Sequence, residues 1–238
     1  MNRVMRLPDP LSGAVTALSL LHARWHAARQ PGRADLRGPG TEFPDLLPTD
    51  RRGSGKQFLE FHREMILGFR EILAAHPAAG FTGNAWTDIP LWLVDFFAWA
   101  QPGFLDGALA RTRALVGEGT ADDLGNFLES TLVTSEPFRG FHGLAHANIA
   151  AYEEQRFGRD HPSLRGASMD RAETSPHNEH FWGLHGWIDD RYSELQRRRK
   201  DAPVAFDRRG SALAPISAPI VHRDRIAEGE RATGRRLH

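Results

Sequence analysis

The sequence predicts a mainly α-helical bundle that folds as a single domain over residues 1–238. Three observations support this prediction. A chain of 238 residues with 40% hydrophobic side chains is long enough to bury one large core. Several segments carry apolar residues at the spacing of a helix face, and stretches rich in glycine, proline and charge separate them. Histidines recur on four of these helical segments.

The first half of the chain is expected to contain two long helices and one aromatic segment. Ser12 could cap a helix that ends near Arg29, before a Pro-Gly pair. Residues 31–55 read as a long irregular connection because glycine, proline and charged residues dominate them. The segment 56–76 has the clearest helical periodicity. The segment 81–99 is the most aromatic in the chain, and we interpret it as core.

The second half of the chain repeats this alternation of periodic and polar segments. Thr120 could cap one of its helices, with acidic residues following in the first turn. Pro176 could start the last long helix, because proline is tolerated in a first helical turn. The expected elements are helices over 103–118, 121–132, 142–155 and 176–199, a polar loop over 157–174, and a tail over 201–238 with a short helix at 224–231.

The composition excludes several classes of function. Thirty basic and thirty acidic side chains cancel, so no global field favours nucleic acid or an anionic membrane as a partner. The chain has no cysteine, which excludes disulfides, thiolate ligands and cysteine nucleophiles. Its twelve histidines are therefore the main supply of soft ligands, and nitrogen or oxygen must hold any transition metal.

The N-terminal region favours a cytoplasmic protein. The longest apolar run there, residues 14–21, is too short to span a bilayer, and Pro8 and Pro10 precede it in place of a basic segment. Export with a partner that carries the signal is the alternative.

His142 and His146 are spaced as metal ligands are on a helix. Residues four apart stack on one face, so their imidazoles can converge on one point. Such a pair alone is more often chance or a surface pair than a metal site. His185 lies beside an apolar stripe on another predicted helix and needs a partner there.

Taken together, four predicted helices present inward histidines. Burying these imidazoles without partners would cost about 1–3 kcal/mol each, and a metal would remove that cost. Helical bundles build metal sites from facing helices, and copper binds most tightly among the metals that imidazole suits. The predicted ligands are His26, His62, His142, His146 and His185.

The last of these histidines lies in a segment that resembles a known motif. Bacterial tyrosinases belong to the type-3 copper family, together with catechol oxidases, o-aminophenol oxidases and haemocyanins, and carry a segment similar to SPNDPxFWLHHxxVDRxWxxWQ. The resemblance implies that His142, His146 and His185 are the ligands of the second copper of a pair. The matching residues are Ser175, Pro176, Phe181, Trp182, His185, Asp189 and Gln196.

Further segments resemble the part of that family around the first copper. Residues 58–65 are similar to FLPWHRxYL, which makes His62 the last ligand of that copper, and the helix with His26 resembles the one with its first ligand. Residues 89–92 resemble an LPYW element, and Glu136 stands where the family has a glutamate that holds a water near the copper. The resemblance covers residues 18–200, and its motifs at 58–65 and 175–196 are specific.

The chain also departs from the family. Gly53 occupies the position of the middle ligand of the first copper, and Gly143 replaces an asparagine thought to orient the water at the glutamate. Another histidine would have to complete the first site, and the candidates are His22, His177 and His180. His22 lies one helical turn before His26, so the two could share a face.

The resemblance implies an oxidase or monooxygenase that acts with O2 on a phenol, an o-diphenol or an o-aminophenol, with two copper ions and Glu136 as the catalytic residue. A specialised biosynthetic tailoring enzyme fits the departures, and a copper-delivering partner could load it. One alternative is a degenerate homologue that serves as a binding or scaffold protein with one metal or none. Another is a mononuclear metalloenzyme. Asp189 is expected to fix a ligand imidazole or an arginine such as Arg63.

Overall fold

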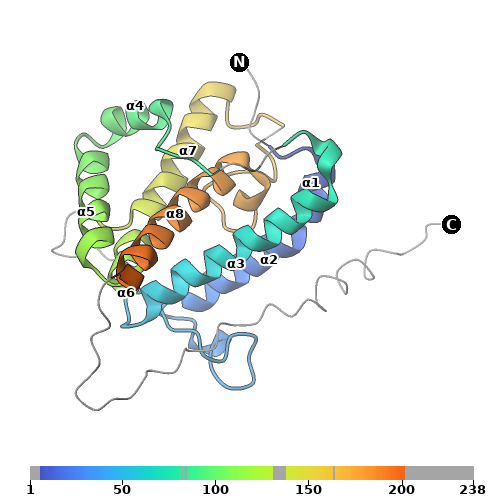
Figure 1. Cartoon of the computed structure of the whole chain (residues 1–238). Coiled ribbons are helices and arrows are strands. Elements are labelled where there is room, and N and C mark those ends of the chain that lie inside the picture. Colours follow the sequence, from blue (N-terminus) through green and yellow to red (C-terminus); the bar gives the residue numbers. More distant parts are fainter. Residues whose placement is uncertain (1–5, 82, 84, 131–137, 163, 202–238) are drawn as a thin grey trace, which may run out of the picture.

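The computed structural model describes residues 6–81, 83, 85–130, 138–162 and 164–201. These residues form a mainly helical bundle without β-strands, as the sequence predicts (Figure 1). The α-helices are α1 (Asp9–Ala14), α2 (Thr16–Arg29), α3 (Ser54–Ala75), α4 (Leu91–Ala100), α5 (Phe104–Glu118), α6 (Ala121–Glu129), α7 (Phe141–Phe157) and α8 (Glu179–Asp201), and the 3-10 helices are η1 (Ala34–Leu36), η2 (Pro77–Ala79) and η3 (Ser175–His177).

The predicted start of the first helix is wrong. The chain enters α1 at Asp9, helped by a proline in the first turn, and the helix breaks at Val15 before α2 begins. Ser12 therefore lies inside α1 and caps nothing. Its buried hydroxyl instead lies 3.0 Å from Nδ1 of His177, which ties α1 to η3, just before α8.

The helix predicted over 56–76 is confirmed and begins two residues earlier, at Ser54. Most of its large apolar residues are buried, although Leu67 is 43% exposed, and the ring of Phe61 stacks on that of Trp25 in α2 with centroids 4.1 Å apart. At its other end Phe69 stacks on Trp182 of α8 at 3.7 Å. The long central helices of Figure 1, α2, α3 and α8, are thus held together by aromatic contacts.

The aromatic segment 81–99 is core only in part. Leu93 and Phe97 are fully buried, but Leu91 is 79% exposed and Trp99 is 71% exposed. The reason is that this segment contributes a ten-residue helix, α4, at the edge of the bundle (Figure 1), and such a helix can bury one face only.

The last long helix starts later than predicted. Pro176 lies in η3, and α8 begins at Glu179 because Asn178 is extended and its side-chain oxygen accepts a hydrogen bond from the amide of His180 at 2.9 Å. The Thr120 cap of α6 is confirmed as part of a capping box with Asp123. Residues 131 and 132 of that predicted helix and the predicted tail helix at 224–231 lie outside the described residues.

Helices α3 and α6 approach closely enough to require glycine. Asp122 of α6 accepts hydrogen bonds from the amides of Gly53 and Gly55 at 2.7 and 2.9 Å. A β-carbon on Gly125 would lie 1.9 Å from the carbonyl oxygen of Gly55. This crossing fixes the start of α3, the helix that carries His62.

We expect Gly125→Ala to destabilise the protein by about 3 kcal/mol, because the added methyl group forces the two backbones apart. Gly117→Ala in α5 is the matched control, since a β-carbon there meets nothing within 4 Å. The control should leave stability unchanged or raise it by up to about 1 kcal/mol. Urea unfolding of both variants measures the difference, and equal stabilities would contradict the tight crossing.

Candidate metal centre

Six imidazoles from four helices converge in the middle of the bundle. His22 and His26 lie one turn apart on α2, as His142 and His146 do on α7. His62 comes from α3 and His185 from α8. Neighbouring rings have centroids 4.5 Å apart for His22 and His26, 4.6 Å for His62 and His185, and 4.6 Å for His142 and His146.

Some of the candidate histidines named from the sequence lie in this central cluster, and others do not. The five predicted ligands and His22 lie together, whereas His177 and His180 lie elsewhere. His177 lies beside Ser12, and the ring of His180 packs against Trp92 at a centroid distance of 4.7 Å. Glu136 lies outside the described residues.

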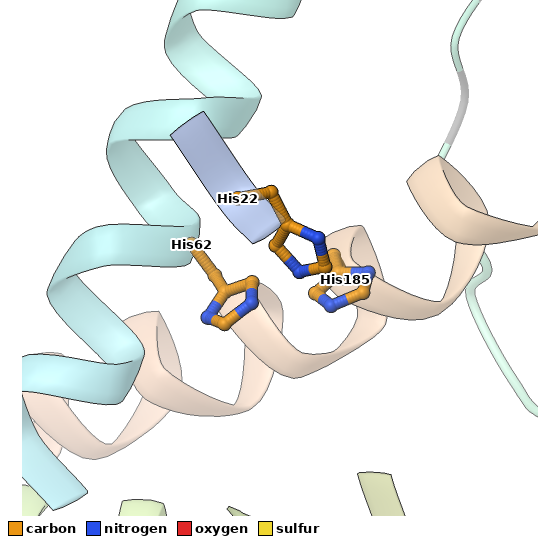
Figure 2. Close-up of side chains that lie close together, drawn as sticks. All are labelled: His22, His62 and His185. Atoms are coloured by element: carbon orange, nitrogen blue, oxygen red, sulfur yellow. The ribbon is translucent and has the colours of Figure 1, made fainter. Parts of the chain in front are cut away.

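Two overlapping groups of nitrogen atoms have the spacing of metal ligands. His22, His62 and His185 form one group, which Figure 2 shows with the three rings turned toward one another from α2, α3 and α8. His142, His146 and His185 form the other, and within each group the ligand atoms lie within 4.8 Å of one another. Nitrogens that share a tetrahedral metal ion at about 2.0–2.1 Å lie somewhat closer together, so small rotations of the rings would suffice.

Hydrogen bonds fix the orientation of four of the rings. Nδ1 of each donates to a backbone carbonyl, which leaves the lone pair on Nε2 for a ligand. These bonds join His22 to Ala172, His62 to Phe58, His146 to Met169 and His185 to Phe181, at 2.8, 2.8, 2.7 and 2.8 Å.

Buried nitrogens without partners point to a ligand that protein groups do not supply. The Nε2 atoms of His22, His26, His62 and His146 are buried and have no hydrogen-bond partner among the described residues. Such atoms are rare in folded proteins because each unsatisfied group costs about 1–3 kcal/mol. A metal ion bound to Nε2 would satisfy them, so the residues present fit a metal.

His142 and His185 are arranged differently, since their Nε2 atoms lie 3.0 Å apart. His185 already donates from Nδ1, so its Nε2 accepts and His142 must donate. A metal at the group of His142, His146 and His185 would replace this hydrogen bond and release Nε2 of His142.

Burial keeps all six imidazoles neutral at neutral pH, which is the form that binds metals. It lowers the pKa of His22 to about 3 and that of His146 to about 4. Burial, followed by the neighbouring imidazoles, also holds the pKa values of the other four well below their usual range. These four are His26, His62, His142 and His185.

Gly53 has a structural explanation, whereas nothing around Gly143 requires a glycine. Gly53 precedes α3 with φ of +94°, a conformation that favours glycine, and its amide donates to Asp122. His22, one of the three candidates for completing the first site, lies in the cluster. A β-carbon on Gly143 would meet nothing within 4 Å, so that position has free space beside it.

Asp189 holds an arginine, one of its two predicted roles. Its carboxylate accepts from Nε of Arg63 at 2.5 Å, and Gln196 accepts from the same guanidinium at 2.7 Å. This contact joins α3 to α8 one residue after His62 and four after His185.

A buried ion pair between Arg29 and Glu129 joins α2 to α6. The sequence analysis did not identify this pair or the carbonyl partners of His22 and His146, because a backbone carbonyl leaves no signal in a sequence.

No protein-family model matches the chain, and a search of curated proteins finds no relative. Among the described residues, no helix combines the length and the apolar character needed to cross a membrane.

The metal-free protein should lose stability as the pH falls from 7.5 to 5.5. The unfolded chain binds protons at its histidines near pH 6.5, whereas the buried imidazoles of the folded chain do not. We expect the midpoint of thermal unfolding to fall by about 10 °C or more, since each such group contributes about 1.4 kcal/mol per pH unit. Glu153, whose pKa burial raises to about 7, opposes this trend as a single group.

His146→Gln should make this pH dependence shallower because it removes one buried imidazole. His76→Gln at the end of α3, outside the cluster, should preserve the slope. A midpoint that stays level from pH 7.5 to 5.5 in the unaltered protein would show that the imidazoles take up protons without unfolding.

Proposed function

We propose that the protein is a copper-dependent oxidoreductase that uses O2 to oxidise a small phenol, o-diphenol or o-aminophenol at a dinuclear centre. One observation supports the centre above all others: buried, unpartnered Nε2 atoms from three helices lie in the same cluster of imidazoles as His142 and His185. The resemblance to the type-3 copper family adds the redox chemistry and the class of substrate.

The six imidazoles divide naturally into three for each ion. His22 and His26 on α2 with His62 on α3 would hold the first ion, and His142 and His146 on α7 with His185 on α8 would hold the second. Each half then consists of one helix with two histidines a turn apart and one helix with a single histidine. In this division His22 provides the ligand that this chain lacks at Gly53.

The donor set favours copper. All candidate ligands are imidazoles, the chain has no cysteine, and copper has the highest intrinsic affinity among the divalent metals that imidazole binds. Bound copper ions would supply the electron transfer to O2. Two o-diphenol molecules, each oxidised to an o-quinone, together provide the four electrons and four protons that reduce one O2 to two waters.

The side chains around the imidazoles would determine what reaches the metals. Phe58, Phe61 and Phe181 are buried against the histidine rings, so they exclude water and keep the site apolar. Histidines 142 and 146 are 7% and 9% exposed, against 1% for His22 and His185, so a substrate would approach from the α7 side. Glu136, which would take the phenol proton through a water, precedes α7 in the chain.

A mononuclear metal centre is the second candidate. It is favoured by the sharing of His185 between both groups of ligand atoms, since one imidazole nitrogen binds one ion at a time. A binding or scaffold protein that holds one metal or none is the third.

Elemental analysis after copper loading and dialysis separates these candidates. We expect two copper ions per chain, one lost in His62→Ala and the other in His146→Ala, and both kept in the control His76→Ala. O2 uptake with catechol and 2-aminophenol should fall by about 100-fold or more in each of the first two variants. One copper that survives His62→Ala would establish the mononuclear centre. If no copper binds, the binding or scaffold protein is the candidate that remains.

A second set of variants tests the ligands on α2. His22→Ala and His26→Ala should each weaken copper binding at the first site while the second site stays full. The measurement is copper content at increasing chelator concentration, with Arg24→Ala on the exposed side of α2 as the control. Two tightly held copper ions in His22→Ala would remove His22 from the ligand set.

A further inference from the structure

We propose that Asn178, braced by Glu153, is a positioning residue that holds one loop against both halves of the metal centre. The loop consists of residues 164–174 and is here called the carbonyl loop. This inference deepens the proposed function, because it assigns the residues that orient one imidazole in each half.

The carbonyl loop provides two of the four carbonyls that orient the imidazoles. Met169 accepts from His146 on α7 at 2.7 Å, and Ala172 accepts from His22 on α2 at 2.8 Å. The two imidazoles belong to different groups of ligand atoms. A displacement of this one loop would therefore disturb both groups together.

His62 and His185 do not depend on the loop. Their Nδ1 atoms donate to carbonyls four residues earlier in their own helices, at Phe58 and Phe181. These bonds persist as long as α3 and α8 remain helical. The centre thus combines two rings oriented from within a helix and two oriented from outside, and the second kind needs a support.

Asn178 supplies that support where the loop meets the start of α8. Its amide nitrogen donates to the carbonyl of Ala167 at 3.0 Å, and its oxygen accepts from the amide of His180 at 2.9 Å. Asn178 and Ala167 are both fully buried. One side chain therefore fixes the loop, two residues before Met169, to the helix that carries His185.

Glu153 of α7 holds Asn178 in place. Both of its carboxylate oxygens lie 3.0 Å from the amide nitrogen of Asn178, and the side chain is almost completely buried. Burial of a carboxylate has a high cost unless hydrogen bonds offset it, and the amide of Asn178 donates to both oxygens of Glu153. Ser19 of α2 adds a hydrogen bond from its hydroxyl to the carbonyl of Glu173 at the other end of the loop.

The first measurement is made on metal-free protein and follows the exchange of the imidazole Nδ1 protons with solvent by NMR. In Asn178→Ala we expect the protons of His22 and His146 to exchange at least about 10-fold faster, while those of His62 and His185 keep their protection. A loss of global stability would accelerate all four. Equal exchange of all four protons in the variant and in the unaltered protein would overturn the proposal.

The second measurement is metal affinity by competition with a chelator, using copper alone as the probe. Asn178→Ala should weaken both sites by about 10- to 100-fold, as substitutions behind a metal ligand do. The control is Asn148→Ala, another buried asparagine, whose amide donates to Gln101 and Leu144 away from the loop. It should reduce stability without changing the affinity of either site. Unchanged affinity in Asn178→Ala would contradict the proposal.

Glu153→Gln provides a milder variant if Asn178→Ala does not fold. Glutamine keeps the volume but offers one acceptor oxygen in place of two, so protection of His22 and His146 should fall by less than in Asn178→Ala and still selectively. Unchanged protection would overturn the role of Glu153. If the unaltered protein binds no copper, the proposed function fails, whereas the proton exchange in metal-free protein still decides whether Asn178 positions the two rings.

Discussion

The burial of six imidazoles and their Nε2 atoms in one cluster is the constraint on which the rest of the structure depends. Four of these nitrogens have no partner among the described residues, and together they destabilise the fold by several kcal/mol. The free energy of unfolding of a folded domain is only about 5–15 kcal/mol. The rings cannot lower this cost by protonation, because burial disfavours the charged form. A bound metal would convert the cost into binding free energy, so folding and metal binding should be closely coupled.

Several polar contacts hold together the helices that carry these histidines. Arg63 and Asp189 join the two helices that each contribute a single histidine, α3 and α8. Arg29 and Glu129 anchor the end of α2 to α6, and the glycine crossing anchors the start of α3 to the same helix. The carbonyl loop joins α2 to α7 through the rings themselves. Each helix with candidate ligands is thus held by a polar contact beyond its apolar packing.

Sequence reasoning predicted the long helices and five of the six clustered histidines, because both depend on local spacing, but it predicted neither α1 nor α4 as a separate helix. The helical period of the segment from Phe58 to Phe69 and the four-residue spacing of His142 and His146 are properties of neighbouring residues. The start of α8 was wrong because the extended backbone of Asn178 depends on contacts with Glu153 and Ala167, which are distant in sequence. His22 could be identified only as a candidate, since its ring is oriented by a carbonyl at residue 172.

His26 decides whether the centre can hold two metals. His185 lies within reach of both groups of ligand atoms, so without another donor the two groups compete for it and one ion results. The ring of His26 lies 4.5 Å from that of His22 and 5.4 Å from that of His62, and its Nε2 is buried and unpartnered among the described residues. His26 belongs to neither group of ligand atoms as they stand, so it would replace His185 in the first group only if its ring moved toward His22 and His62. We infer that His185, once its hydrogen bond with His142 is broken, then binds the ion of the second group. His22 and His26, one helical turn apart on α2, would provide ligands for the other ion without His185.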